Sequence, residues 1–97
     1  MKYLDIKNGK CEGWTVPTYY FEAVAFAKEV KQICMFVRSG TGDTLTPEGK
    51  IKKVVSTNYK FQDGTRFIIQ ETPDGELFRI ETKDIYSGDW ETVYCVH

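Results

Sequence analysis

The side chains that most often carry catalysis are few in this chain, and they do not lie at catalytic spacings. The single histidine, His97, is the last of 97 residues. A general base must be held in place, whereas an imidazole at a chain end is poorly held. Any Ser–His or Cys–His nucleophile pair would need this residue, and one histidine cannot supply a multi-histidine metal site. The sequence therefore predicts a protein that is not an enzyme.

The three cysteines, Cys11, Cys34 and Cys95, are widely spaced and include no C-x-x-C pair. An odd number at such spacings argues against a disulfide scaffold and a zinc site, so we expect no metal and no cofactor. Unpaired thiols are typical of a reducing cytoplasm. Cys34 and Cys95 lie in apolar runs and are expected to be buried. Cys11 lies between Lys10 and Glu12, and the sequence leaves open whether its thiol is exposed.

A glycine-rich segment at 39–42, Ser-Gly-Thr-Gly, has the composition of a phosphate-binding loop but not its motif. A Walker loop needs a lysine followed by Ser or Thr after its last glycine. Here Asp43 and Thr44 follow, and the acid would repel phosphate. We therefore expect a flexible connection over 39–43, continued by a turn at 46–49.

Two carboxylates, Asp84 and Asp89, flank a predicted turn that also holds Tyr86 and Trp90. Such a group can bind a cation or orient a ligand, whereas the simpler interpretation is that the acids cap backbone groups of the turn.

Aromatic residues are the least average feature, with two Trp, six Tyr and six Phe in the chain. Rings in or beside loops often serve as contact anchors, although they can also complete a thin core. The predicted binding residues are the aromatic and acidic side chains of such segments: Trp14, Tyr20, Asp84, Tyr86, Asp89 and Trp90.

The charges are balanced, with 13 basic and 14 acidic residues and a net charge of −1. This balance gives no general field that would steer the protein to nucleic acid or an anionic membrane. Lys50, Lys52 and Lys53 form the densest basic cluster, which Lys60 and Arg66 extend. Strand alternation would place Lys52 and Lys53 on opposite faces, and a solvated strand edge explains the cluster as well.

The first half of the chain contains one helix candidate, Tyr19–Lys31, with Thr18 as its N-cap. Its apolar stripe, Ala23, Phe26, Ala27 and Val30, is expected to face the core. The alternative is that the whole stretch from Tyr20 is extended. Before the helix, we expect a strand at 3–7, a turn at Asn8-Gly9 and a loop over 9–17.

The second half predicts an antiparallel meander of strands 51–61, 66–72 and 76–82. Asp63-Gly64 is a two-residue hairpin signal, and 73–75 is expected to be a three-residue turn. This register places Tyr59 and Ile80 opposite Ile68. One face then holds the expected core, Val55, Tyr59, Phe61, Ile68, Phe78 and Ile80. The other face is mixed and includes Phe67, Ile69 and Leu77. A turn or short 3₁₀ segment at 84–90 and a strand at 92–96 follow.

Together these patterns predict a single α+β domain over 1–97, with one helix packed on a small antiparallel sheet or a partly open SH3-like barrel. The favoured function is a non-enzymatic binding protein, an inhibitor or adaptor that acts on another macromolecule through an aromatic surface. Viral and mobile-element accessory proteins are often this compact and free of motifs. The alternative is a protein that sequesters a small nucleotide ligand, for which a pocket between the subunits of a homo-oligomer is one possible place. Nucleic-acid binding through Lys50–Lys53 ranks third, and no membrane segment or secretory signal is predicted.

Overall fold

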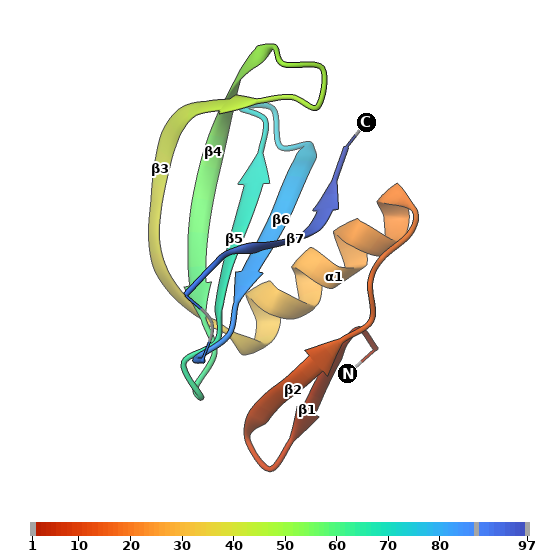
Figure 1. Ribbon diagram of the computed structural model, residues 1–97, viewed down its shortest axis with the longest axis vertical. Coiled ribbons are helices and arrows are strands. Elements are labelled where there is room, and N and C mark those ends of the chain that lie inside the picture. The colour runs from red at the N-terminus through yellow and green to blue at the C-terminus, as the bar shows by residue number, and fades with distance from the viewer. Residues whose placement is uncertain (1, 87, 97) are drawn as a thin grey trace.

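The computed structural model describes residues 2–86 and 88–96. They form one helix and two antiparallel sheets (Figure 1). In chain order the elements are β1 (Leu4–Lys7), β2 (Lys10–Trp14), α1 (Tyr20–Ile33), β3 (Met35–Leu45), β4 (Ile51–Lys60), β5 (Arg66–Glu71), β6 (Leu77–Lys83) and β7 (Glu91–Cys95). The predicted α+β class, with one helix and mainly antiparallel sheet, is confirmed.

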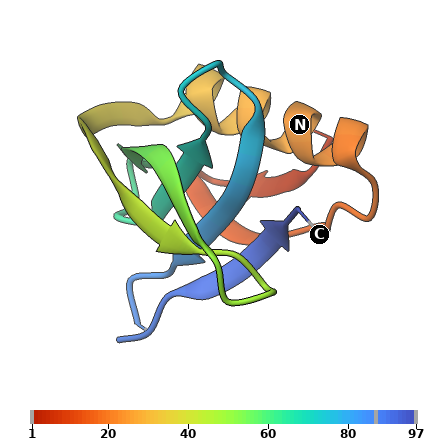
Figure 2. The same cartoon turned by 90° about the horizontal axis from the view of Figure 1, so that it is seen from above.

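The large sheet is a five-stranded meander, because β3 to β7 are neighbours in chain order, while β1 and β2 form a separate hairpin. Figure 1 shows the hairpin beneath α1. Figure 2 shows the large sheet curling away from the helix, so that the β3–β4 turn and β7 lie on the same side. No closed barrel forms among the described residues, so the SH3-like detail stays a prediction.

The main core lies between α1 and the sheet face that the helix covers. Phe26 is fully buried, and its ring centroid lies 6.2 Å from that of Phe67 on β5. Ala23, Ala27 and Val30 are buried beside it, so the predicted apolar stripe of the helix is confirmed. Burial of each large apolar side chain contributes about 1.5–3 kcal/mol.

The helix begins one residue later and ends two residues later than its pattern predicts. Tyr19, and not Thr18, is the N-cap, because its carbonyl accepts the first helical hydrogen bond. The Glu22 carboxylate accepts hydrogen bonds from the backbone N–H groups of Thr18 and Tyr19, both at 3.1 Å. This acid therefore satisfies donors that the first turn would otherwise leave unpaired.

The glycine-rich segment is a strand, so the expected flexible connection over 39–43 is wrong. β3 pairs with β4 through the whole segment, from Ser39 opposite Thr57 to Asp43 opposite Lys53. β3 has no other strand neighbour, and a Cβ at Gly40 would touch nothing within 4 Å. An edge strand of this kind tolerates glycine, because no side chain is needed to fill space.

The first meander turn contains three residues, 62–64, and not the predicted two. The Phe61 N–H donates to the Thr65 carbonyl at 2.8 Å, which closes the hairpin outside these residues. Gly64 takes the left-handed conformation at the last loop position, with φ of 101°. A three-residue hairpin needs glycine at that position, so the same Asp-Gly pair fits both turn types.

This extra loop residue shifts the register by one, so each side chain of β5 lies on the face opposite to the predicted one. The predicted core residues Phe61, Phe78 and Ile80 are still buried. Tyr59 lies opposite Phe67 and not Ile68. Phe67, Ile69 and Leu77, which the prediction set on a mixed face, are therefore buried in the core, whereas Ile68 is only half-buried.

The second meander turn agrees with the prediction, because the Thr72 N–H donates to the Glu76 carbonyl across a three-residue loop. A β-bulge then leaves Phe78 without a partner on β5. As a result, Ile80 lies opposite Ile69 and not Ile68. A bulge of this kind inserts one residue without any distinct local signal.

The predicted loop over 9–17 is wrong for its first half, which forms β2. Asn8 and Gly9 have φ of 52° and 74°, so they make the predicted tight turn between β1 and β2. Glu29 of α1 fixes β1, because its carboxylate accepts the backbone N–H groups of Lys2, Tyr3 and Leu4 at 3.2, 2.8 and 3.3 Å.

No helix in the described ranges is long and apolar enough to cross a membrane.

Candidate functional site

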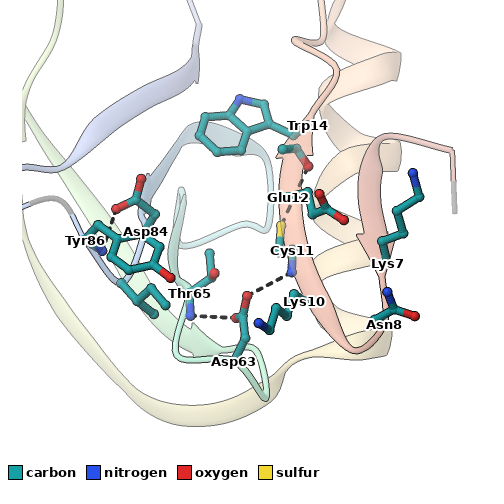
Figure 3. Close-up of a pocket in the computed structure, with 12 residues that line it drawn as sticks. Lys7, Asn8, Lys10, Cys11, Glu12, Trp14, Asp63, Thr65, Asp84 and Tyr86 are labelled. Carbon is teal, nitrogen blue, oxygen red and sulfur yellow. Dashed lines mark hydrogen bonds between the residues drawn. The ribbon is translucent and has the colours of Figure 1, made fainter.

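The main hollow of interest lies between the β1–β2 hairpin and the turns at the end of the large sheet. We call it the hairpin cleft, and its volume is about 490 Å³. Figure 3 shows Trp14 and Cys11 of β2 on one side and Asp84 and Tyr86 on the other, with Asp63 between them. The cleft therefore joins segments that are more than 70 residues apart in the sequence.

Asp63 joins the first meander turn to β2, on one side of the cleft. Its carboxylate accepts the Cys11 N–H at 2.8 Å and the Thr65 N–H at 2.9 Å. The neighbouring Gln62 donates from Nε2 to the Gly9 carbonyl at 3.0 Å. The first meander turn therefore also fixes the N-terminal hairpin to the large sheet, and we call Gln62 and Asp63 the clamp residues.

The 84–86 segment lies over the same turn. A Cβ built on Gly64 would lie 2.7 Å from Cγ2 of Ile85, so these two residues are in direct contact. The Asp84 carboxylate accepts the Tyr86 N–H at 2.9 Å, as an Asp in a turn often does. The expected turn-capping role of Asp84 is therefore present, and it orients the chain as it leaves β6.

Burial and hydrogen bonds shift the pKa values of three groups in or near the cleft, Asp63, Cys11 and Cys34. Partial burial raises the pKa of Asp63, but the hydrogen bonds from Thr65 and Cys11 outweigh it and lower the pKa below its usual 3.8. Burial raises the pKa of the Cys11 thiol, and the nearby Asp63 and Asp5 carboxylates raise it further. Burial also raises the pKa of Cys34 to about 12. Both thiols therefore stay protonated at neutral pH and are not activated nucleophiles.

The rim of the cleft exposes large side chains to solvent. Tyr86 is 90% exposed, Ile85 51% and Trp90 37%. The Lys83 ammonium lies 5.9 Å from the centre of the Trp90 ring. Ile85 and Tyr86 leave more than half of their surface exposed at the lining of the cleft, which is typical of a contact surface.

A second, smaller hollow of about 280 Å³ adjoins the hairpin cleft and shares Trp14 and Asp84 with it. Asp89 and Trp90 also line it. The structure thus brings together five of the six predicted binding residues, Trp14, Asp84, Tyr86, Asp89 and Trp90.

Tyr20, the sixth predicted residue, lies apart from this group. Its hydroxyl accepts the Leu77 N–H at 3.1 Å, and it lines a different hollow beside Val24 and Lys31. Tyr20 therefore helps to join α1 to β6. The 84–90 segment was predicted to be a turn or a short 3₁₀ segment, and its described residues show bends at 85–86 and 88–89 and no 3₁₀ helix; Ser87 lies outside the described residues.

Sequence reasoning missed the clamp residues Gln62 and Asp63 as part of the site. Both act over more than 50 positions of sequence, and neither belongs to a motif. The described residues also contain no group of three His, Cys, Asp or Glu side chains that could hold a metal ion. The arrangement can bind a partner by ring contact and hydrogen bonding.

No protein-family model, curated protein or solved structure matches this chain.

Proposed function

We propose that this protein is a non-enzymatic binding module that holds a protein partner against the rim of the hairpin cleft. The observation that carries the proposal is the exposure of Ile85 and Tyr86 at the hairpin cleft and of Trp90 at the smaller hollow that adjoins it. Tyrosine and tryptophan at the centre of an interface supply most of its binding energy, because each buries a large ring with little loss of entropy.

The cleft beside these rings complements them. A partner that covers Tyr86 and Trp90 can place one of its own side chains in the 490 Å³ space between Trp14 and the 84–86 segment. Asp84 and Asp89 are both exposed at this rim, where they orient a basic or hydrogen-bonding group of the partner.

A module of this kind acts by occupying a surface, so it suits an inhibitor or adaptor, such as the compact accessory proteins of viruses and mobile elements. The three cysteines are unbonded. Free thiols favour a reducing cytoplasm as the place where the protein works.

A flat small ligand is the second candidate, and the size of the cleft favours it. Small-molecule sites occupy about 300–1,000 Å³ and are lined by aromatic side chains with a few polar groups. Trp14 and Tyr86, with Asp63 and Asp84, meet that description. A nucleotide that raised the melting temperature of the wild type, but not of Trp14→Ala, would favour this second function.

The test of the first function is a selection of displayed peptides on the immobilised protein, followed by affinity measurements on variants. Tyr86→Ala is the test variant, and Tyr19→Ala is its matched control, because Tyr19 is also exposed, at 63%, but lies at the start of α1. Loss of an anchor that contributes at least 2 kcal/mol weakens binding by about 30-fold or more.

We expect peptides selected on the wild type to lose this affinity for Tyr86→Ala and to keep it for Tyr19→Ala. The proposal fails if no peptide is enriched. It also fails if the enriched peptides bind Tyr86→Ala as tightly as the wild type.

A further inference from the structure

The large sheet has a second face that α1 does not cover, and we call it the open face. Tyr59, Phe67 and Thr82 lie opposite one another on the helix-covered face, where Phe67 and Thr82 are fully buried. Successive residues of a strand point to opposite faces. The next residues in the ladder, Lys60, Arg66 and Lys83, therefore lie side by side on the open face.

Three further cations lie at strand positions of the open face. Arg38 is paired with Asn58, one step along the ladder on the same face. Arg79 donates to Thr44 Oγ1, and Lys52 is the ladder partner of Thr44. The open face thus holds six cations, including every arginine of the chain: Arg38, Lys52, Lys60, Arg66, Arg79 and Lys83.

Acidic residues are almost absent from these strand positions, although the whole chain carries a net charge of −1. Glu81 is the single carboxylate on the open-face positions of β3 to β6. Within residues 2–86 and 88–96, the one ion pair joins Lys31 to Glu71, on the other side of the sheet. The strand positions of the open face therefore carry a net positive charge on an otherwise balanced protein. Asp84, Asp89 and Glu91 line a hollow together with Lys83 at one end of the row.

Fold stability does not explain the row formed by Lys60, Arg66 and Lys83. Like charges directly opposite each other destabilise a sheet. Lysines can protect a sheet edge from aggregation, but β4, β5 and β6 are interior strands, so these cations protect no edge. Nε of Arg66 is also buried without a hydrogen-bond partner in the described residues. An arginine that served only solubility would extend its guanidinium into water and leave no buried donor unpaired.

We propose that the open face binds single-stranded nucleic acid, with its phosphates on the row of Lys60, Arg66 and Lys83. The strands are about 4.8 Å apart, so the row spans about 10 Å across the sheet and can contact successive phosphates. Arginine suits this role, because its planar fork matches phosphate geometry.

Two features favour a single strand over a duplex. The sheet curls toward its open side, where the β3–β4 turn and β7 both lie, so this face is concave and not flat (Figure 2). The Lys83 ammonium also lies over the Trp90 ring, which places an aromatic side chain at the end of the row. Cations that follow the backbone, together with a ring for base stacking, are the usual means of binding single strands.

This surface differs from the expected Lys50–Lys53 cluster, whose members the structure separates. Lys53 is paired with Asp43 and points away from the open face, whereas Lys52 points toward it. Lys53 and Lys60 are exposed lysines on the same strand with opposite orientations. They therefore form a matched pair of variants for a test.

The experiment measures binding of a fluorescein-labelled oligothymidine of about ten nucleotides by anisotropy, between about 50 and 200 mM salt. Three phosphate contacts on a single strand predict a slope of log K against log[salt] of about −2. Lys60→Gln should reduce the magnitude of this slope by about 0.7, and Lys53→Gln should leave it unchanged. Thermal unfolding of both variants checks that they remain folded.

The inference is overturned if the wild type does not bind at the lowest salt, or if the two glutamine variants weaken binding equally. It is also overturned if a labelled oligoglutamate binds as tightly as the oligonucleotide. Tyr86→Ala should keep its oligothymidine affinity, so failure of the protein-binding proposal and failure of this inference are distinguishable.

Discussion

Gly64→Ala tests whether the 84–86 segment lies on the first meander turn, as the cleft requires. The alanine must adopt a φ of about 101°, which costs roughly 1–2 kcal/mol. Its Cβ would also lie 2.7 Å from Cγ2 of Ile85, and overpacking of this kind costs about 1–3 kcal/mol. We therefore expect the free energy of unfolding to fall by roughly 2–5 kcal/mol.

Gly75→Ala is the matched control, because Gly75 has φ of 94° but a Cβ there would touch nothing within 4 Å. It should cost only the backbone penalty of about 1–2 kcal/mol. The double variant Gly64→Ala with Ile85→Ala should recover most of the difference, since Cβ of Ile85 lies at an ordinary 3.9 Å from the added Cβ.

Urea unfolding measures all three variants, and a loss of 1 kcal/mol corresponds to a fall of about 4–8 °C in melting temperature for a domain of this size. Equal losses for Gly64→Ala and Gly75→Ala would refute the contact with Ile85. Failure of Ile85→Ala to rescue the double variant would refute it as well.

Two further predictions concern the contacts that hold the hairpin to the rest of the fold. Because its pKa is lowered in the folded protein, the ionised Asp63 carboxylate stabilises the fold at pH values above its usual pKa of 3.8. This contribution is lost as the pH falls through the lowered pKa. The stability difference between the wild type and Asp63→Asn should therefore be constant above about pH 5 and shrink in acid; a difference that grows in acid would contradict the assigned hydrogen bonds. Glu29→Ala should abolish hydrogen-exchange protection at the amides of Tyr3 and Leu4 while α1 stays protected, and unchanged protection there would disprove the anchor.

The elements that local patterns govern could be predicted from the sequence. The helix has a clear apolar stripe, and a tight hairpin turn requires positive φ at both central positions, which Asn8 and Gly9 adopt readily. The meander was also readable, because Asp63-Gly64 and the turn at 73–75 punctuate three strand-like runs.

Register and long-range contacts could not be predicted, because single residues decide them. Asp63-Gly64 fits a two-residue and a three-residue hairpin equally well, and the choice exchanges the faces on which Phe67 and Ile68 lie. The bulge at Phe78 has no distinct local pattern. β3 was missed in part because its glycines suit an exposed edge as well as a loop.

Trp14, Tyr86 and Trp90 could be grouped from the sequence alone, because all three are aromatic residues in or beside expected loops. The cleft between these residues depends on the hydrogen bond from the Cys11 N–H to Asp63, two residues that are 52 positions apart in the sequence. The basic open face was hidden for the same reason, since its row appears only once the register is known.

The most direct test of the binding surface compares stability and affinity in one variant, Trp90→Ala. Trp90 is 37% exposed at the rim, so we expect its free energy of unfolding to fall by much less than the 3–5 kcal/mol that a buried aromatic side chain costs. Its affinity for a peptide selected on the wild type should fall by about 30-fold or more. A variant destabilised by about 3–5 kcal/mol that binds the peptide with unchanged affinity would make Trp90 a core residue and contradict the proposed surface.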